Sequence, residues 1–305
     1  MEVNFKDLLN QQLNDFYEKI VNLKNFQSII KENTASLLKG LSEKRERIEQ
    51  INEDPTVDDI IKKFNGRQLR NFSFFSPYSG VREFIGYRNI DIQEQADLHF
   101  IHKNKQYQWL LVEAYEAFED FVESIYGCAG YIDPAFWSAS DFGDISLKDI
   151  ALQDFEWFHN QAIKKKHSPR SILQKFRLKL PNFANVEQNN KTFNNYRLTI
   201  TMIENFRHVI VHRNGTFGDK SQFIKKVIQE SDLSRKDTVI AEKLLAQYTS
   251  QLNGKDVIYL LEKQTLTSFM YYDTLGQLLD IVLGYAFIIK CELDEYLSSN
   301  GCENT

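Results

Sequence analysis

The sequence predicts an all-α protein: a helical bundle extended at its N-terminus by a long helix or a helical hairpin. Its 305 residues include only five prolines and thirteen glycines, fewer than the frequent turns of an all-β protein require. Several long segments repeat apolar residues at helical spacing. With 42% hydrophobic and 26% charged residues, the chain has the composition of a globular protein and not of a disordered one.

Residues 5–53 are expected to form the long helix or hairpin. Alternate steps of four and three residues give thirteen positions, ten of them apolar: Leu9, Leu13, Phe16, Ile20, Leu23, Gln27, Ile30, Thr34, Leu37, Leu41, Lys44, Ile48 and Ile51. Such a seam packs against a partner helix of the same or another chain. The helix should end at "NEDPT" (52–56), because the residue before proline disfavours the α conformation.

Residues 66–95 are predicted to be irregular, with room for short strands, because they contain Pro77 and three glycines. This stretch is expected to join two parts of the chain. The predicted organisation is an N-terminal helical region over 1–66, a junction over 67–99, and a main helical domain over 100–305.

The main domain is expected to begin with a helix over residues 107–127. Its apolar residues share one stripe, and Gly127 suits the end of a helix. Residues 128–190 are predicted to be a long insertion, with a loop containing Pro134 and a short helix over 147–161.

Three further helical segments complete the predicted bundle. Residues 191–213 have a helical pattern that stops at Asn214–Gly215, although "RLTITM" within it alternates like a strand. Residues 221–252 should hold one or two helices. Residues 265–298 should form a strongly apolar closing helix.

One segment concentrates positive charge in a chain whose formal net charge is −5. Between Trp157 and Val186 there is no acid, and the cations are Lys164, Lys165, Lys166, Arg170, Lys175, Arg177 and Lys179, with His167 beside them. Phosphate attraction is local, so this run predicts binding of a polyanion. The alternative is an ordinary solvated helix face.

The sequence favours a soluble cytoplasmic protein without membrane contact. The three cysteines (Cys128, Cys291 and Cys302) form no CxxC pair and are expected to be reduced. The N-terminus lacks the pattern of a signal peptide. The most apolar run, Ile281 to Ile289, is shorter than the roughly 20 residues of a membrane span.

The segment "ENFRHVIVHRNG" (204–215) carries the candidate chemistry. On a helix, Glu204, His208 and His212 fall on one stripe, and Arg207 lies within reach of Glu204. A separate apolar face forms the packing side of the helix, with Ile203, Phe206 and Ile210. One face therefore packs while the other presents an acid, an arginine and two imidazoles.

Several chemistries could use this stripe. A zinc protease helix would carry a glutamate between the histidines, where this chain has Val-Ile-Val, so no metal site is expected. No glycine-rich nucleotide cradle is present, and no cofactor is expected. Acid–base cleavage of an RNA phosphodiester remains, because histidine titrates near neutrality and arginine binds phosphate oxygens in a fork.

The run Arg207-His208-Val209-Ile210-Val211-His212 resembles the R-φ-x3-H motif of HEPN-domain ribonucleases, in which φ is usually Asn, His or Asp. Glu204, Gly215 and the upstream "LLVEAYEAFEDFVESIYG" are also similar to that family, over roughly residues 100–298. The resemblance implies an all-α bundle and a homodimer in which two motifs form one metal-independent site. It also implies that Arg207 and His212 are catalytic, that His208 gives polar support, and that Glu204 orients Arg207.

The resemblance further implies a toxin or abortive-infection effector that cuts tRNA or other cellular RNA, held in check by an antitoxin or another regulatory protein. A tyrosine used for antitoxin control in one subgroup is replaced here by Asn214, so that mode of control is not expected. The residues predicted to bind RNA are Lys164, Lys165, Lys166, Arg170, Lys175, Arg177, Arg213 and Asn214. The alternative is a non-catalytic HEPN-like interaction module that recruits a protein partner through its N-terminal seam.

Overall fold

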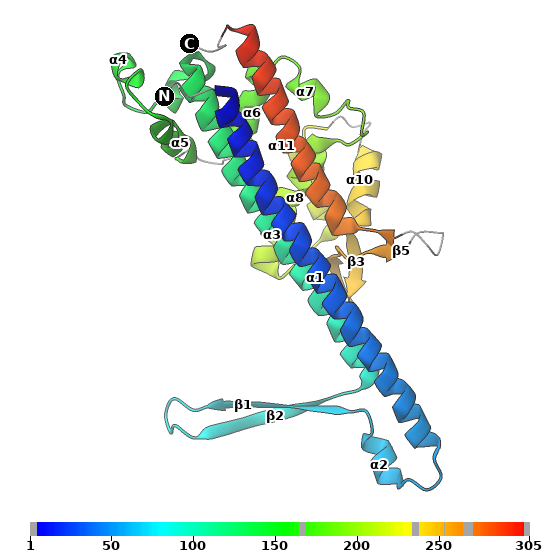
Figure 1. Cartoon of the computed structure of the whole chain (residues 1–305). Coiled ribbons are helices and arrows are strands. Elements are labelled where there is room, and N and C mark those ends of the chain that lie inside the picture. The colour runs from blue at the N-terminus through cyan, green and yellow to red at the C-terminus, as the bar shows by residue number, and fades with distance from the viewer. Residues whose placement is uncertain (1–4, 165–168, 234–237, 253, 265–270, 302–305) are drawn as a thin grey trace. The chain divides into compact units, whose positions relative to one another are not determined.

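The computed structural model describes residues 5–164, 169–233, 238–252, 254–264 and 271–301 (Figure 1). Helices dominate this part of the chain, and its strands form three separate two-stranded sheets. The all-α prediction is therefore confirmed. The chain divides into two compact units, one of residues 1–25 with 107–305 and one of residues 26–106.

Two long helices contribute to both units. Helix α1 (Phe5–Glu53) is one continuous helix, so the hairpin alternative is excluded. Helix α3 (Ile92–Ile132) begins earlier and ends later than the predicted helix over 107–127. Both expected boundaries, after residues 66 and 99, lie inside the second unit. The division falls elsewhere because residues 5–25 of α1 pack with the C-terminal part of the chain.

The N-terminal seam finds its partner within the first unit. Leu9, Leu13, Phe16, Ile20 and Leu23 are all buried. The Phe16 ring lies 5.1 Å from the Phe121 ring and 6.2 Å from the Phe118 ring of α3, measured between centroids. The heptad pattern thus describes packing of α1 on α3 of the same chain.

Gly127 lies inside α3 and does not end it, contrary to the prediction. A Cβ atom there would lie 3.0 Å from the His159 Cα and 3.1 Å from its N. Glycine is needed at this position because another segment's backbone approaches closely, and not because the helix stops.

The predicted insertion over 128–190 is part of the core of the first unit. Its first residues belong to α3, and it continues through two 3-10 turns (Pro134–Phe136 and Ala139–Asp141) into α4 (Leu147–Ile150), α5 (Phe155–Ile163), α6 (Arg170–Lys179) and α7 (Phe183–Val186). The predicted helix over 147–161 is split in two, and Asp154 caps the second by accepting from Trp157 N. Trp137 stacks on Tyr126 of α3 at 5.1 Å between ring centroids, which anchors the segment to the bundle.

Beyond this segment, α8 (Tyr196–Arg213) ends where the predicted helix over 191–213 ends but begins later, and it is followed by α9 (Lys220–Glu230) and α10 (Thr238–Gln247). Next come two small hairpins, β3 (Thr249–Leu252) with β4 (Lys255–Ile258), and β5 (Lys263–Gln264) with β6 (Tyr271–Tyr272). The closing helix α11 (Thr274–Ser299) starts later than predicted, and residues 265–270 of that prediction lie outside the described residues.

Helix α11 is the core helix of the first unit. Its Tyr285 is fully buried and stacks at 5.7–5.8 Å on rings of α3, α7 and α8, those of Phe118, Phe183 and Tyr196. By length and composition alone α11 is apolar enough to cross a membrane, but half of its most apolar window is buried against the rest of the chain. That burial is also what a core helix of a globular protein shows.

The second unit contains the rest of α1, the short α2 (Asp59–Phe64), the start of α3, and an antiparallel hairpin of β1 (Gln68–Phe75) and β2 (Arg82–Ile90). The prediction of an irregular stretch over 66–95 was therefore wrong, and its alternative of strands is confirmed. The Gln95 amide of α3 donates to the carbonyl oxygens of Gly66 and Ile90, both at 3.3 Å, and so fixes the base of the hairpin.

A buried ion pair joins the helices of the first unit. The side chain of Glu187 is 0% exposed, and Arg177 of α6 donates to its two oxygens at 2.8 and 2.7 Å. The Tyr285 hydroxyl of α11 also donates to this carboxylate. Arg177 was predicted to bind RNA, but its guanidinium is committed to this pair.

Replacing Arg177 by Met should leave the Glu187 carboxylate buried without its counter-charge. We expect the free energy of unfolding to fall by about 3–5 kcal/mol, as when one partner of a buried pair is removed. Urea unfolding followed by circular dichroism measures it. The control is Lys179→Met in the same helix, where the side chain is exposed and a change within about 0.5 kcal/mol is expected. A similar small change for both variants would contradict the prediction.

Candidate functional site

Helix α8 carries the predicted site residues near its C-terminal end. Its first turn is capped by Asn195, whose side chain accepts from Leu198 N at 2.9 Å. The strand-like "RLTITM" is helical. The hydroxyls of Thr199 and Thr201 donate hydrogen bonds to the backbone carbonyls of Asn195 and Arg197, at 3.0 and 2.9 Å. Residues 198–203 of α8 are all buried. The strand-like alternation therefore comes from β-branched residues that pack on several sides of a buried helix.

The end of α8 is fixed by its backbone and by the β4 strand. Asn214 and Gly215 both have positive φ, 54° and 73°, so the helix stops there as predicted. Gly215 O accepts from Ile258 N, and Phe217 N donates to Asp256 O, both at 2.9 Å. The Gln108 amide of α3 donates to Ile258 O at 2.7 Å, which holds this connection against the bundle.

The two histidines lie together at this end, as their spacing predicted. Both are exposed, and their ring centroids are 4.6 Å apart. Partial burial lowers the pKa of His208, and the nearby His212, Lys226, Arg213 and Arg207 lower it further. The lowered pKa favours the neutral imidazole of His208, which can accept a proton. Within the described residues, no three His, Cys, Asp or Glu side chains are grouped so as to hold a metal ion.

Arg207 is held by carboxylates of α3. Its Nη2 lies 3.2 Å from Glu116 Oε1 and 3.9 Å from Glu119 Oε2, and 39% of its side chain is exposed. Both contacts use the same nitrogen. Its Nε is buried and makes no hydrogen bond to any described residue. The two carboxylates thus orient the guanidinium through Nη2, while its Nε donor stays without a partner among the described residues.

Glu204 does not orient Arg207, contrary to the prediction. Its carboxylate pairs instead with Arg170 of α6 at 2.9 Å, and Arg170 also contacts Glu230 of α9 at 3.0 Å. Spacing of three residues along α8 permits a Glu204–Arg207 contact, but packing places α3 carboxylates nearer to Arg207 and an α6 arginine nearer to Glu204.

Glu119 is the acid that sequence reasoning missed. Its pKa is raised from 4.5 to about 7, chiefly by burial; Arg207 opposes the rise, and the carboxylates of Glu123, Glu204 and Glu116 contribute to it. Its only sequence signal is its spacing of three residues from Glu116, which places two carboxylates on one side of a helix. A cation from another element is the natural partner of such a pair.

Most described cations of the predicted RNA-binding run contact the protein's own acids. Besides Arg170 and Arg177, Lys175 donates to Ser138 Oγ at 2.6 Å and lies 3.7 Å from Asp141. These three residues are therefore structural in part, which corrects the prediction of a free basic face. Lys164, Arg213 and Asn214 are exposed, whereas Lys165 and Lys166 lie outside the described residues.

A shallow pocket of about 300 Å³ lies beside His208. It is formed by α8 and α9 and is lined by Asn205, His208, Val209, Arg213, Asp219, Gln222, Phe223 and Lys226. Its lining contains two cations, one imidazole and a single acid, and Lys226 also lies 3.8 Å from Glu230 of α9. The excess of positive charge in the lining suits an anionic group. Asn205, Gln222 and Lys226 are further residues that the motif did not indicate.

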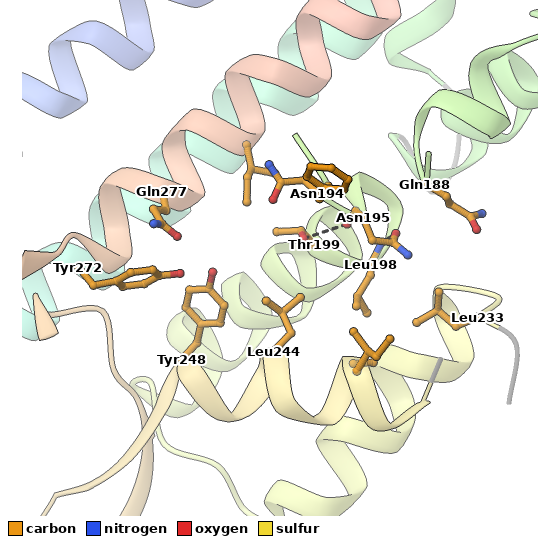
Figure 2. A pocket seen from close by; sticks show the side chains of 14 residues that line it. Gln188, Asn194, Asn195, Leu198, Thr199, Leu233, Leu244, Tyr248, Tyr272 and Gln277 are labelled. Carbon is orange, nitrogen blue, oxygen red and sulfur yellow. Dashed lines mark hydrogen bonds between the residues drawn. The ribbon is translucent and has the colours of Figure 1, made fainter. Parts of the chain in front are cut away.

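A second pocket, of about 310 Å³, opens near the start of α8. Figure 2 shows Tyr248 and Tyr272 at one side of it and Asn194, Asn195 and Gln188 at the other. No charged side chain is among its described lining residues, and none of the predicted site residues lines it. It therefore lacks the groups that acid–base chemistry needs.

Comparison with models of protein families, with curated proteins and with solved structures finds no match to this chain. The resemblance to HEPN ribonucleases therefore depends on the motif residues and their surroundings, and the activity that it implies stays a prediction.

Replacing Gly215 by Ala should loosen the end of α8. The backbone there has a φ of 73°, and a Cβ atom would lie 2.3 Å from Gln108 Oε1. We expect a loss of about 1–3 kcal/mol in the free energy of unfolding, measured by urea titration. The control is Gly254→Ala, where φ is also 73° but nothing lies within 4 Å. Equal losses in both variants would show that the Gln108 contact has no effect.

Replacing Glu119 by Gln should change stability only where the carboxyl ionises. Because folding raises its pKa from 4.5 to about 7, the folded chain holds the proton more tightly than the unfolded chain. This stabilisation is complete below pH 4.5 and is lost as the pH rises through about 7. The variant should therefore melt a few degrees higher than the wild type near pH 8, with no difference near pH 4.

Differential scanning calorimetry at the two pH values measures this effect. Glu116→Gln is the control, because 52% of the Glu116 side chain is exposed and its removal should alter the melting temperature little. A shift for Glu119→Gln that is the same at both pH values would contradict the assigned titration.

Proposed function

We propose that this protein is a metal-independent endoribonuclease whose site contains Arg207, His208 and His212. The observation that carries the proposal is the exposed pair of imidazoles, 4.6 Å apart, on the same helix end as an arginine oriented by two carboxylates. Two imidazoles this close disfavour the state in which both are cationic, so a neutral imidazole can lie beside a protonated one. A general base and a general acid are thereby available together.

The reaction needs three roles. One imidazole removes the proton of the ribose 2′-hydroxyl, the 2′-oxygen attacks phosphorus, and the bond to the 5′-oxygen breaks. A protonated imidazole gives its proton to the departing 5′-oxygen, leaving a 2′,3′-cyclic phosphate and a 5′-hydroxyl. The lowered pKa of His208 suits the base, and His212 is then the acid. Arg207 stabilises the negative charge that develops on the phosphorane oxygens.

The pocket beside His208 supports binding of a neighbouring phosphate. Arg213 and Lys226 are the cations among its lining residues, and Arg213 has no acid partner within the described part of the chain. The cationic end of α8 thus supplies local positive charge at the site in a chain whose net charge is negative.

The proposal includes a homodimer, a cytoplasmic location and an RNA substrate, with control by an antitoxin or another regulatory protein. A two-fold arrangement would bring the exposed ends of two α8 helices together and double the number of imidazoles and arginines in one site. The role of a toxin or abortive-infection effector that cuts tRNA belongs to the same proposal and is supported by the motif. A non-catalytic interaction module is the outcome if cleavage is absent.

Replacing Arg207 or His212 by Ala should abolish most cleavage of RNA while the chain still folds. Loss of one acid–base group costs about 10²–10⁴-fold in rate, so kcat/KM should fall at least about 100-fold. The substrate is total tRNA in buffer containing EDTA, and the products are tested for 2′,3′-cyclic phosphate ends. Circular dichroism and light scattering verify fold and oligomeric state.

The matched control is His102→Ala, an exposed histidine of α3 in the second unit, which should retain full activity. Undiminished cleavage by the Arg207→Ala, His212→Ala double variant would overturn the proposal. Complete loss of wild-type cleavage on addition of EDTA would overturn the metal-independent mechanism.

A further inference from the structure

The hairpin of β1 and β2 exposes an unusual number of aromatic rings. Six rings are between 48% and 99% exposed: those of Phe72, Phe74, Phe75, Tyr78, Phe84 and Tyr87. A two-stranded hairpin is marginally stable without a face to pack, and large exposed apolar patches mark binding surfaces. The register of the strands shows how these rings are arranged.

Residues that pair directly across an antiparallel hairpin lie on the same face. The pairs Asn71–Tyr87, Ser73–Phe84 and Phe75–Arg82 therefore follow one another along one face. Each of these three levels carries one ring. Along β1 the levels are two residues apart, or about 7 Å, and a register shift adds one residue on β2 between Tyr87 and Phe84. The face is a row of separated rings and not a continuous apolar layer.

The same segment is basic. Residues 66–90 contain four arginines (Arg67, Arg70, Arg82 and Arg88) and a single acid, Glu83. Arg70 stands directly opposite Arg88, a like-charge arrangement that weakens a hairpin by itself. Arg88 pairs with Glu94 at 3.3 Å, whereas Arg67 and Arg70 form no ion pair with any described residue. An external anion would relieve this repulsion.

One arginine is combined with a ring. The Arg82 guanidinium lies 5.9 Å from the centroid of the Phe75 ring, and its Nε donates to Ser73 Oγ at 3.0 Å. The side chain is thus held along the row of rings by two contacts, and its terminal nitrogens remain available to an anion. A ring beside an oriented guanidinium is the pairing that a base and its phosphate require.

We infer that the β1–β2 hairpin binds single-stranded RNA, with bases stacked on Phe75, Phe84 and Tyr87 and phosphates held by the arginines. A second copy of the hairpin would bring two sets of arginines together, and an apolar protein partner would leave them unpaired. Duplex RNA keeps its bases stacked on each other and cannot use the rings. The choice of RNA over DNA rests on the proposed function; the rest stands on the hairpin alone.

The test is fluorescence anisotropy with a fluorescein-labelled oligouridine, a duplex RNA and a single-stranded DNA of equal length. The full chain is used with His212→Ala in the background, so that cleavage does not consume the probe. Adding Phe75→Leu and Phe84→Leu should weaken oligouridine binding about tenfold or more, because stacking is lost while apolar bulk remains. Phe75→Tyr with Phe84→Tyr should restore it, and Phe287→Leu, an exposed ring of α11, is the control.

The arginines are tested through salt. Adding Arg67→Gln and Arg70→Gln should reduce the slope of log K against log salt by about 0.7 for each phosphate that the chain no longer neutralises. Unchanged binding in both the leucine and the glutamine variants would overturn the inference. So would equal affinity for duplex RNA, or loss of self-association instead of RNA binding in the leucine variant. Because cleavage is assayed separately in the His212 wild type, failure here leaves the proposed nuclease activity to its own test.

Discussion

The buried carboxylate of Glu187 is the constraint on which the first unit depends. A charge with no exposure to water must be neutralised and hydrogen-bonded where it lies. Arg177 of α6 and Tyr285 of α11 do this, and the backbone oxygen of Glu187 accepts from Tyr196 N at 2.9 Å. One residue thereby ties α6, α11 and the start of α8 together, and the stacked ring of Tyr285 extends the connection to α3 and α7.

This arrangement matters for the site because α8 is positioned at both ends. Its start is fixed at Glu187, and its end is fixed by the Gly215–Ile258 hydrogen bond. Between them Arg207 is drawn toward Glu116 and Glu119. The raised pKa of Glu119 shows that holding an ionised acid there is unfavourable for the fold. Sites that orient charges for function commonly carry such a cost.

The proposed chemistry and the inferred RNA recognition belong to different compact units. The imidazoles and Arg207 belong to the first unit, and the basic aromatic hairpin belongs to the second. The basic run over residues 164–179 was predicted to bind RNA. Most of its described cations form internal ion pairs, whereas Arg67 and Arg70 near the hairpin form none with any described residue. These cations therefore fall into two groups. Those of the 164–179 run mostly stabilise the bundle through internal ion pairs, and Arg67 and Arg70 of the hairpin region form no such pair within the described residues.

The sequence by itself determined what depends on neighbours along the chain. Helical periodicity predicted α1 and the stripe of His208 and His212, and Asn214–Gly215 predicted the end of α8, because backbone conformation and spacing of three or four residues are local properties. Only the tertiary structure decided which charges meet. Arg207 and Glu116 are 91 residues apart and Glu204 and Arg170 are 34 apart, and no local pattern encodes such pairs. Packing likewise made Gly127 a point of close approach and not a helix end.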